Sequence, residues 1–326
     1  GSRHRNCYGL RQLVMKRRTL VLGLSAAFVQ LPRRVLAADS PIRLGNVALD
    51  SSSEIFSAMS EGFLSRAGID VQLQNFTNGS AIAAAVVSGS LDVGGSNVLS
   101  LASAHEKGLP LKIIGSGAVY TTKNPTTVML VAKNSKLRTA RDLNGTTIGV
   151  NVLKGIAHIS AEGWVDKNGG DSKQVRFVEL PFSATPAAII AGRVDAGVVP
   201  EPFLTQSKND TRFFAKSYDG IADRWMIDAY IANETWIAAN RDLARRFAQA
   251  MRQAGTWANH HQDKTAEIVS KAMNVDLSVV RSMARASFLE RTDLSVVQPV
   301  VDAGAQYGAL TARFPASDLF NPDALH

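Results

Sequence analysis

One segment of the chain occurs twice in closely similar form. Residues 84–94 read AAVVSGSLDVG and residues 187–197 read AAIIAGRVDAG, which keeps the pairs Gly89/Gly192, Asp92/Asp195 and Gly94/Gly197. The similarity continues upstream, where Leu44-Gly45 corresponds to Ile148-Gly149, and FLSRAGIDVQLQ (63–74) to WVDKNGGDSKQVRFVEL (164–180). A unit of about fifty residues that is used twice predicts two similar lobes with a cleft between them.

Positive charge is concentrated at the N-terminus. Eight of the 36 lysine and arginine residues lie in residues 1–38, which hold no acidic residue, so the rest of the chain balances 28 basic against 28 acidic side chains. A neutral body gives no support for nucleic-acid binding. The basic residues 15–18, the apolar residues 20–31 and the small residues before Asp39 predict a cleaved export signal over residues 1–38, of which residues 1–14 form an upstream extension. The alternative is an amphipathic extension that is not cleaved.

The same segment indicates the compartment. Arg17-Arg18 resembles a twin-arginine export signature, with general secretion as the alternative route, and the apolar run is too short to span a bilayer. Cys7, the one cysteine, lies in the part expected to be removed, which leaves no disulfide and no thiolate metal site. We therefore expect a protein without a cofactor that is soluble in an exported compartment.

Strand and helix patterns alternate along most of the chain, which predicts an α/β fold with mostly parallel sheets. A two-strand hinge would join lobe one (39–126 and 230–326) to lobe two (127–229). The first lobe is expected to contain a helix from residue 53 to Gly68, and residues 230–238 to form the strand that returns the chain to it. Later helices are predicted over residues 263–273, 276–287 and 294–311.

Ligands of open parallel sheets bind beyond the carboxyl ends of the strands. The residues predicted to follow strands or begin helices there are Ser51, Ser52, Ser53, Gly79, Ser80, Ser96 and Asn97 in lobe one, and Lys154, Gly155, Phe182, Ser183 and Glu201 in lobe two. Hydroxyls, amides and helix N-termini suit a small anion. Each Ser or Asn could instead only cap its own helix.

Two of the remaining candidates are ambiguous. Glu201 would repel an anion unless Lys154 paired with it, and could instead accept an amine or help the lobes to close. Tyr120 could form an aromatic wall of the cleft or belong to the core.

Catalytic patterns are absent from the sequence. No histidine has a partner at metal-ligand spacing, and no nucleophile elbow, phosphate loop or dinucleotide fingerprint occurs. Asp92 and Asp195 occupy equivalent places in the two copies, so a shared turn role is a better interpretation than an acid–base pair. We expect no enzymatic activity.

Three segments resemble a known family. SGSLDVGGSN (88–97), DLNGTTIGVN (142–151) and ELPFSATPAAIIAGRVDAGVVPEPF (179–203) are similar to the solute-binding proteins of ABC importers for nitrate, taurine and aliphatic sulfonates, and FPASDLFNPDAL (314–325) is similar to their C-terminal tail. This group also includes binders of pyrimidine precursors of thiamine. The resemblance implies a soluble periplasmic monomer with a type II periplasmic-binding fold, whose lobes close on a ligand and deliver it to a membrane permease.

The resemblance leaves the ligand open. The expected ligand is a small organic anion of the sulfonate, nitrate or carboxylate type, and the alternative is a pyrimidine thiamine precursor. Two further candidates for the function are an enzyme of the same fold acting on such a compound and a binding module that signals through a membrane partner. Pro200 and Phe203 flank Glu201-Pro202, where family members commonly have Trp.

Overall fold

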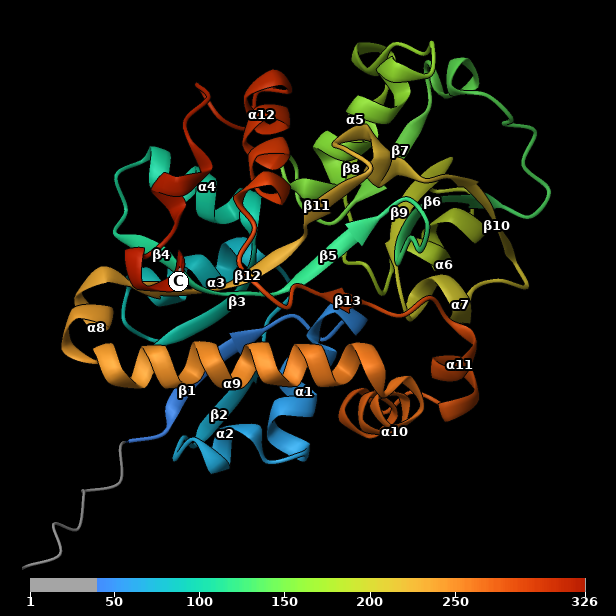
Figure 1. Ribbon diagram of the computed structural model, residues 1–326. Coiled ribbons are helices and arrows are strands. Elements are labelled where there is room, and N and C mark those ends of the chain that lie inside the picture. The colour runs from blue at the N-terminus through green and yellow to red at the C-terminus, as the bar shows by residue number, and fades with distance from the viewer. Residues whose placement is uncertain (1–39, 326) are drawn as a thin grey trace, which may run out of the picture. The chain divides into compact units, whose positions relative to one another are not determined.

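The computed structural model of the protein describes residues 40–325, so the predicted export signal and Cys7 lie outside the described residues. The described residues form two five-stranded sheets and one three-stranded sheet (Figure 1). None of their helices is long and apolar enough to cross a membrane.

The first sheet has the strand order β2-β1-β3-β12-β4. Strand β12 runs antiparallel to both of its neighbours, whereas β1 is parallel to β2 and to β3. The strands are β1 Ile42–Asn46, β2 Val71–Asn75, β3 Val93–Asn97, β4 Leu111–Ser116 and β12 Asp228–Asn233.

The second sheet repeats this topology, with the order β8-β7-β9-β6-β10 and β6 as the reversed strand. Its strands are β6 Thr127–Ala132, β7 Thr147–Val150, β8 Arg176–Glu179, β9 Ala196–Pro200 and β10 Thr211–Ala215. Four of the five strands in each sheet therefore point the same way. The predicted α/β class with two sheet-based lobes is confirmed.

The repeated residues have matching roles in the two sheets. The Asp92 carboxylate accepts a hydrogen bond from the backbone amide of Arg43 at 2.9 Å, and the Asp195 carboxylate accepts one from the amide of Thr147 at 2.8 Å. Each aspartate thus joins the strand it precedes to the start of the neighbouring parallel strand, β1 in the first sheet and β7 in the second. This is the turn role that the sequence favoured.

The shared glycines allow a helix to lie directly on each sheet. A Cβ on Gly94 would come within 2.4 Å of Ile82, and a Cβ on Gly197 within 2.3 Å of Thr185. Ile82 and Thr185 lie on the corresponding helices of the two copies. The repeat therefore encodes one βα packing unit, built twice.

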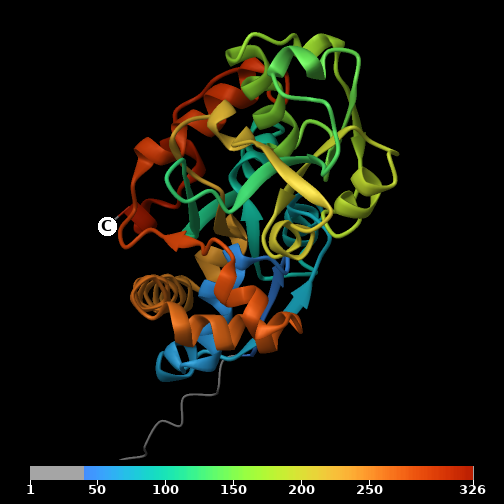
Figure 2. The same ribbon diagram turned by 90° about the vertical axis from the view of Figure 1, so that its right-hand side faces the viewer.

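Helices cover both faces of the first sheet. On one face, α9 packs against β4 and α1 packs against α9 and α10, as Figures 1 and 2 show for the orange and blue helices. On the other face, α3 packs against β3 and α4, and α4 packs against α12. These helices are α1 Ser53–Ser60, α2 Phe63–Arg66, α9 Arg241–His260, α10 Gln262–Met273, α3 Gly79–Val87, α4 Val98–Glu106 and α12 Gln298–Gln306.

The second sheet is covered in the same way, by α5 on one side and by α6 and α7 on the other. Helix α8 follows β12, and α11 contacts both α10 and α7. Their bounds are α5 Ile156–Lys167, α6 Thr185–Ile190, α7 Phe203–Gln206, α8 Glu234–Ala239 and α11 Leu277–Ser282.

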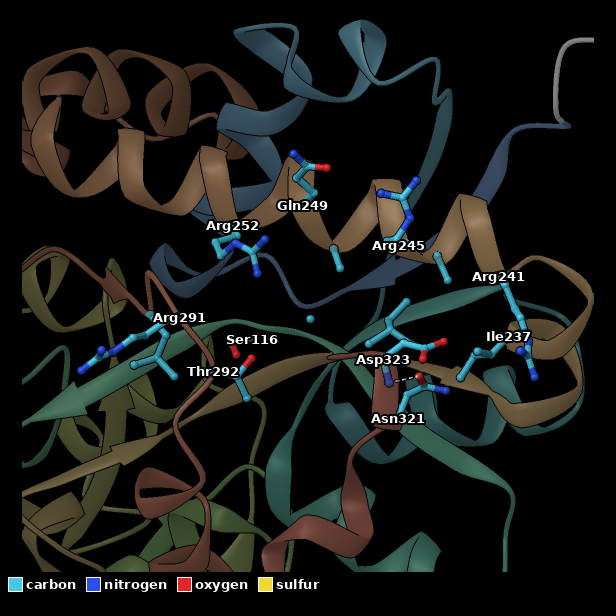
Figure 3. Close-up of a pocket in the computed structure, with 15 residues that line it drawn as sticks. Ser116, Ile237, Arg241, Arg245, Gln249, Arg252, Arg291, Thr292, Asn321 and Asp323 are labelled. Carbon is cyan, nitrogen blue, oxygen red and sulfur yellow. Dashed lines mark hydrogen bonds between the residues drawn. The ribbon is translucent and has the colours of Figure 1, made fainter. Parts of the chain in front are cut away.

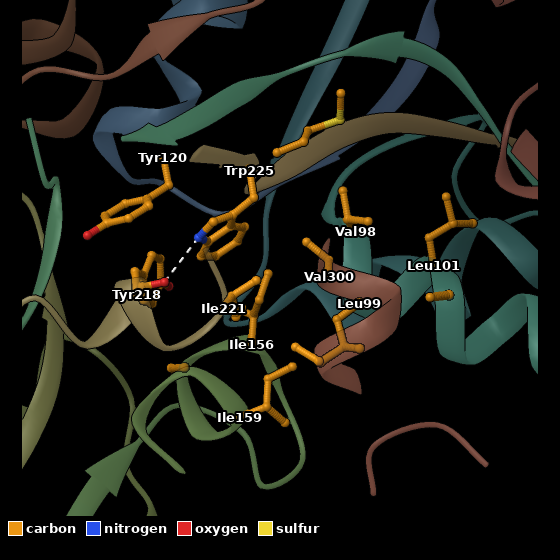
Figure 4. Packing of buried hydrophobic residues seen from close by; sticks show 14 of the residues in the cluster. Val98, Leu99, Leu101, Tyr120, Ile156, Ile159, Tyr218, Ile221, Trp225 and Val300 are labelled. Atoms are coloured by element: carbon orange, nitrogen blue, oxygen red, sulfur yellow. Dashed lines mark hydrogen bonds between the residues drawn. The ribbon is translucent and has the colours of Figure 1, made fainter. Parts of the chain in front are cut away.

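Two chain segments connect the large sheets, and they pair with each other as β5 (Ala118–Thr121) and β11 (Arg224–Met226). Strand β13 (Ser287–Phe288) adds to β5. Trp225 and Tyr120 are fully buried at this connection, and the indole of Trp225 donates to the carbonyl of Tyr218 at 3.1 Å (Figure 4). The predicted two-strand hinge is therefore present and lies within the largest hydrophobic cluster.

Several predicted bounds were wrong. The helix expected from residue 53 to Gly68 is split because Gly62 adopts a positive φ of 73°. The return strand begins earlier, at Asp228, and ends at Asn233, whose side chain caps α8. The helix predicted over residues 276–287 ends at Ser282, and the one predicted over residues 294–311 is a 3₁₀ turn (Leu294–Val296) followed by α12.

Candidate ligand-binding cleft

A cavity of about 70 Å³ lies between residues of the two large sheets. From the first sheet and its loops it is lined by Asn46, Ser51, Asn78, Gly79, Asn97, Asp228 and Tyr230, and from the second by Asn151, Ile156 and Phe182. A second cavity of about 30 Å³, lined by Asp50, Thr126 and Glu201 among others, shares Ser51, Phe182 and Tyr218 with it. One water molecule needs a cavity of roughly 10–15 Å³, so the two cavities together suit a solute about the size of one small ring.

Two asparagines of this cavity have an unpartnered polar atom. Asn46 is 4% exposed, and its Oδ1 accepts from the hydroxyl of Ser52 at 2.7 Å, which leaves Nδ2 buried without a partner in the described residues. Asn151 Oδ1 is likewise buried and unpartnered there. Because buried polar groups are rarely left unpaired, one free donor and one free acceptor from opposite sheets are available here to a solute or a water molecule.

Acidic groups dominate the charge at the cavity. Burial raises the pKa of Asp228 to about 6, although its carboxylate accepts a hydrogen bond from the amide of Ala118 at 2.7 Å. Neither cavity is lined by a lysine or an arginine among the described residues. Behind Asp228, burial also raises the pKa of Glu54 well above its usual range, and Asp228 raises it further. An ionised Asp228 would therefore favour a ligand that presents N–H groups.

Glu201 and Asp50 lie at the second cavity. The Glu201 carboxylate accepts from the backbone amide and the hydroxyl of Thr205, at 3.0 and 2.9 Å, and burial raises its pKa. Asp50 forms an ion pair with Arg285, whose Nε donates to Asp50 Oδ1 at 2.8 Å. Glu201 therefore has no cation partner of its own among the described residues, and Lys154, the partner considered from the sequence, lies elsewhere.

Six of the predicted site residues line these cavities: Ser51, Ser52, Gly79, Asn97, Phe182 and Glu201. Gly79 is required by a close approach, since a Cβ there would lie 2.4 Å from Asn97 Nδ2. Asn78 and Asn97 also cap α3 and α4 by accepting from Ala81 N and Ser100 N, each at 2.9 Å. Capping and cavity lining are therefore combined in Asn97.

Four predicted serines do not line either cavity. Ser96 is buried and donates to the carbonyl of Gly79 at 2.8 Å, which holds the start of α3 against β3. Ser53 is buried at the start of α1. Ser80 and Ser183 are exposed, and the Ser80 hydroxyl lies 3.2 Å from that of Ser100.

Three further candidates lie away from the cavities. Lys154 adopts a positive φ of 56°, and its Nζ donates to the carbonyl of Tyr307 at 2.9 Å. Gly155 is the N-cap of α5 and does not line the cavity, whereas the next residue, Ile156, does. Tyr120 is 1% exposed in the core, where its hydroxyl donates to Asp219 at 2.7 Å.

The sequence reasoning missed Asn46, Asn151, Asp228 and Tyr230 as lining residues. Asn46 is the last residue of β1 and Asn151 directly follows β7, so a strand-end rule that covered both the last residue of each strand and the residue after it would have found both. Asp228 begins β12, whose reversed direction brings the start of this strand to the carboxyl end of β3.

Signs of catalytic chemistry are few in residues 40–325. No group of three or more His, Asp or Glu side chains there could hold a metal ion. His158 is buried in α5 and its Nδ1 accepts from the backbone amide of Lys154 at 2.8 Å. Burial, and next the charge of Lys154, lower the pKa of His158 to about 4, which makes it a neutral structural group at pH 7.

The described residues have the fold of periplasmic binding proteins. The structure superposes on a periplasmic aliphatic sulphonate binding protein from Escherichia coli with a TM-score of 0.71, 17% identity and coverage of 88% of this chain and 99% of that one. It also matches a periplasmic nitrate-binding protein from Synechocystis with a TM-score of 0.71 and 16% identity over 87% of this chain and 86% of that one.

The chain belongs to the NMT1/THI5-like family, whose model matches residues 51–265. A Brucella abortus protein named as a binding protein is 25% identical over 283 residues, 83% of each chain. A 4-amino-5-hydroxymethyl-2-methylpyrimidine phosphate synthase from Schizosaccharomyces pombe is 24% identical over 61% of this chain and 60% of its own length. A formylaminopyrimidine-binding protein from Halalkalibacterium halodurans is 21% identical over 66% of this chain and 64% of its own length.

Proposed function

We propose that the protein is an exported receptor that binds one small solute between its lobes and presents it to the permease of an ABC importer. Lobe one would comprise residues 39–126 and 230–326, and lobe two residues 127–229. The unpartnered Nδ2 of Asn46 and Oδ1 of Asn151 carry this proposal, because a ligand that bonds to both would stabilise the closed arrangement of the lobes.

The ligand that suits the cleft best is a small nitrogen heterocycle with an exocyclic amino group. Such a compound offers a ring-nitrogen acceptor for Asn46 Nδ2, and the two N–H groups of its amino substituent are donors for Asn151 Oδ1 and for the carboxylate of Asp228. Phe182 and Tyr218 line the same space and could contact the face of a ring. The family and the formylaminopyrimidine-binding relative support a pyrimidine as the heterocycle.

A small anion is the second candidate. The N-termini of α3, α4 and α5 adjoin the cavity through Gly79, Asn97 and Ile156, and such termini favour negative charge. Against it, Asn78 and Asn97 already occupy one amide of α3 and one of α4, and the carboxylate of Asp228 would repel an anion. The sulphonate- and nitrate-binding neighbours are similar in fold only.

We also propose that the protein acts without catalysis. The synthase relative makes an enzyme the alternative, but the buried, neutral His158 is held by a backbone amide and does not line the cleft. A cytoplasmic protein that retains residues 1–38 would favour the enzyme. Export with removal of those residues supports the receptor.

A thermal-shift panel tests the ligand class. A compound that binds the folded state raises the melting temperature with the logarithm of its concentration above the dissociation constant. We expect 4-amino-2-methylpyrimidine to raise it and ethanesulfonate, nitrate and benzoate to have no effect at equal ionic strength. A shift with ethanesulfonate alone would favour the anion, and native mass spectrometry of the unheated protein would identify any solute that co-purifies.

A further inference from the structure

A second concave site lies on the first lobe, apart from the cleft. This groove has a volume of about 360 Å³ and is bounded by α9, the end of β4, residues 289–292 and residues 321–323 (Figure 3). It shares no lining residue with either cavity of the cleft. Its volume is within the range of small-molecule pockets, about 300–1,000 Å³.

Four guanidinium groups gather around this groove. Arg241, Arg245 and Arg252 project from α9, and Arg291 lies across from them on the segment that follows β13 (Figure 3). The α9 arginines are four and seven residues apart, so they follow one side of the helix over about 16 Å. The body of the protein balances 28 basic against 28 acidic residues, so net charge does not account for such a cluster.

Most of these arginines have no partner in the described part of the chain. Arg245 is paired with Asp242 at 2.7 Å, whereas the side chains of Arg241, Arg252 and Arg291 make no ion pair or hydrogen bond with residues 40–325. The carboxylate of Asp323 is the single acidic group in the lining, counted over those residues. Because Asp242 compensates Arg245, three guanidinium groups against one carboxylate leave a local excess of positive charge.

The floor of the groove is apolar. Ile114, Ile237 and Leu289 are between 3% and 8% exposed and line it together with Ala244 and Ala248. An apolar floor below fork-shaped cationic groups matches a compound with a hydrocarbon body and carboxylate or phosphate substituents. A solvated basic surface alone would not require a concave apolar floor.

We propose that this groove is a second ligand site, which binds a small organic polyanion with an apolar body and two or more carboxylate or phosphate groups. Arg252 and Arg291 would hold it from opposite sides, and Arg241 would extend the site along α9. The proposal is independent of the ligand of the cleft, because the two sites have no residue in common.

Isothermal titration of the purified protein with benzene-1,3,5-tricarboxylate tests the proposal, with acetate as the monoanion control. We expect one equivalent of the tricarboxylate to bind, more weakly at high salt, and acetate not to bind. The double variant Arg252→Gln/Arg291→Gln should lose at least about tenfold in affinity, since each charge-assisted hydrogen bond contributes about 1.5–3 kcal/mol. Both arginines are exposed, so folding should be retained.

The matched control is Arg193→Gln/Lys123→Gln, which removes the same charge from exposed positions outside the groove. This control and a cleft variant, Asn97→Trp, should bind the tricarboxylate as the unmodified protein does. Failure to bind at millimolar concentration, or an equal loss in the Arg193/Lys123 control, would overturn the proposal. Binding of hexaglutamate without binding of the tricarboxylate would also overturn it, in favour of an acidic protein partner.

Discussion

Asn46, at the end of β1, and Asn151, directly after β7, line one cavity from two different sheets, and each leaves one buried amide atom unpartnered in the described residues. The Asn46 amide lies 2.7 Å from the hydroxyl of Ser52, which also lies 2.6 Å from the carbonyl of Val47. A solute that satisfies both asparagines would connect the two sheets. In the function we propose, this relationship links the duplicated fold to ligand binding.

Removing the second amide should weaken binding without unfolding the protein. Asn151→Ala deletes the free acceptor, so we expect affinity for 4-amino-2-methylpyrimidine to fall at least about tenfold, by the loss of a buried hydrogen bond. Asn168→Ala deletes an exposed amide that donates to the carbonyl of Trp164, and should leave affinity unchanged. Titration calorimetry compares the two. Equal affinities would exclude Asn151 from the site.

Asp228 should lower stability at high pH. Its pKa is raised to about 6 by burial, so the carboxyl stabilises the folded state below about pH 4, and this contribution is lost as pH rises through 6. Asp228→Asn keeps an acceptor for the amide of Ala118 and removes the buried charge. We expect the variant to gain on the order of 2 kcal/mol in unfolding free energy at pH 8 and nothing at pH 4, while losing affinity for the aminopyrimidine.

Urea unfolding at the two pH values measures this gain. Asp210→Asn, at an exposed position, is the matched control and should leave the unfolding free energy unchanged at both pH values. If Asp228→Asn were less stable than the unmodified protein at pH 8, burial would not be the cause of the raised pKa of Asp228.

The duplicated aspartates should matter for folding and not for binding. Asp92→Ala and Asp195→Ala each remove the acceptor for a strand amide, that of Arg43 or of Thr147. We expect each variant to lose about 1–3 kcal/mol of unfolding free energy and to keep its ligand affinity. An affinity change without a stability change in either variant would refute the turn role.

His158 should make the protein sensitive to acid. Its pKa of about 4 in the folded state lies below the ordinary value of 6.5, so the unfolded chain takes up the proton first as pH falls. We expect stability to fall by about 2 kcal/mol between pH 7 and pH 5 from this residue, and His158→Gln to remove that part of the loss. The exposed His260, changed to Gln, serves as the control. The slope of unfolding free energy against pH, taken from chemical denaturation, should change only in the first variant.

The local features of the fold were predictable because short sequence signals encode them. Asn78 caps α3, and Gly89 and Gly192 take positive φ values of 74° and 65° after their helices, as the repeat indicates. The hinge strands β5 and β11 were not predicted individually, because each is three or four residues long and is defined by pairing with a segment about a hundred residues away. Such pairing leaves little trace in local periodicity.

The position of the cavities was predictable from the sequence, whereas several side-chain contacts around them were not. The strand-end rule located Gly79, Asn97, Phe182 and Glu201 at the cavities, since backbone topology determines where strands end. It could not show that the Lys154 side chain bonds to Tyr307, or that Ser96 bonds to Gly79 behind the cavity. Those outcomes depend on side-chain direction and on distant partners. Asp228 was missed because its strand is inserted between β3 and β4 from far along the chain.

Titration of the purified protein with 4-amino-2-methylpyrimidine, alongside the Asn97→Trp variant, tests the central claim most directly. We expect one equivalent to bind the unmodified protein and none to bind the variant, whose indole would fill a cavity of about 70 Å³. Circular dichroism should show that the variant is folded. Binding of ethanesulfonate but not of the pyrimidine, or equal binding of the pyrimidine by both proteins, would contradict this account of the cleft.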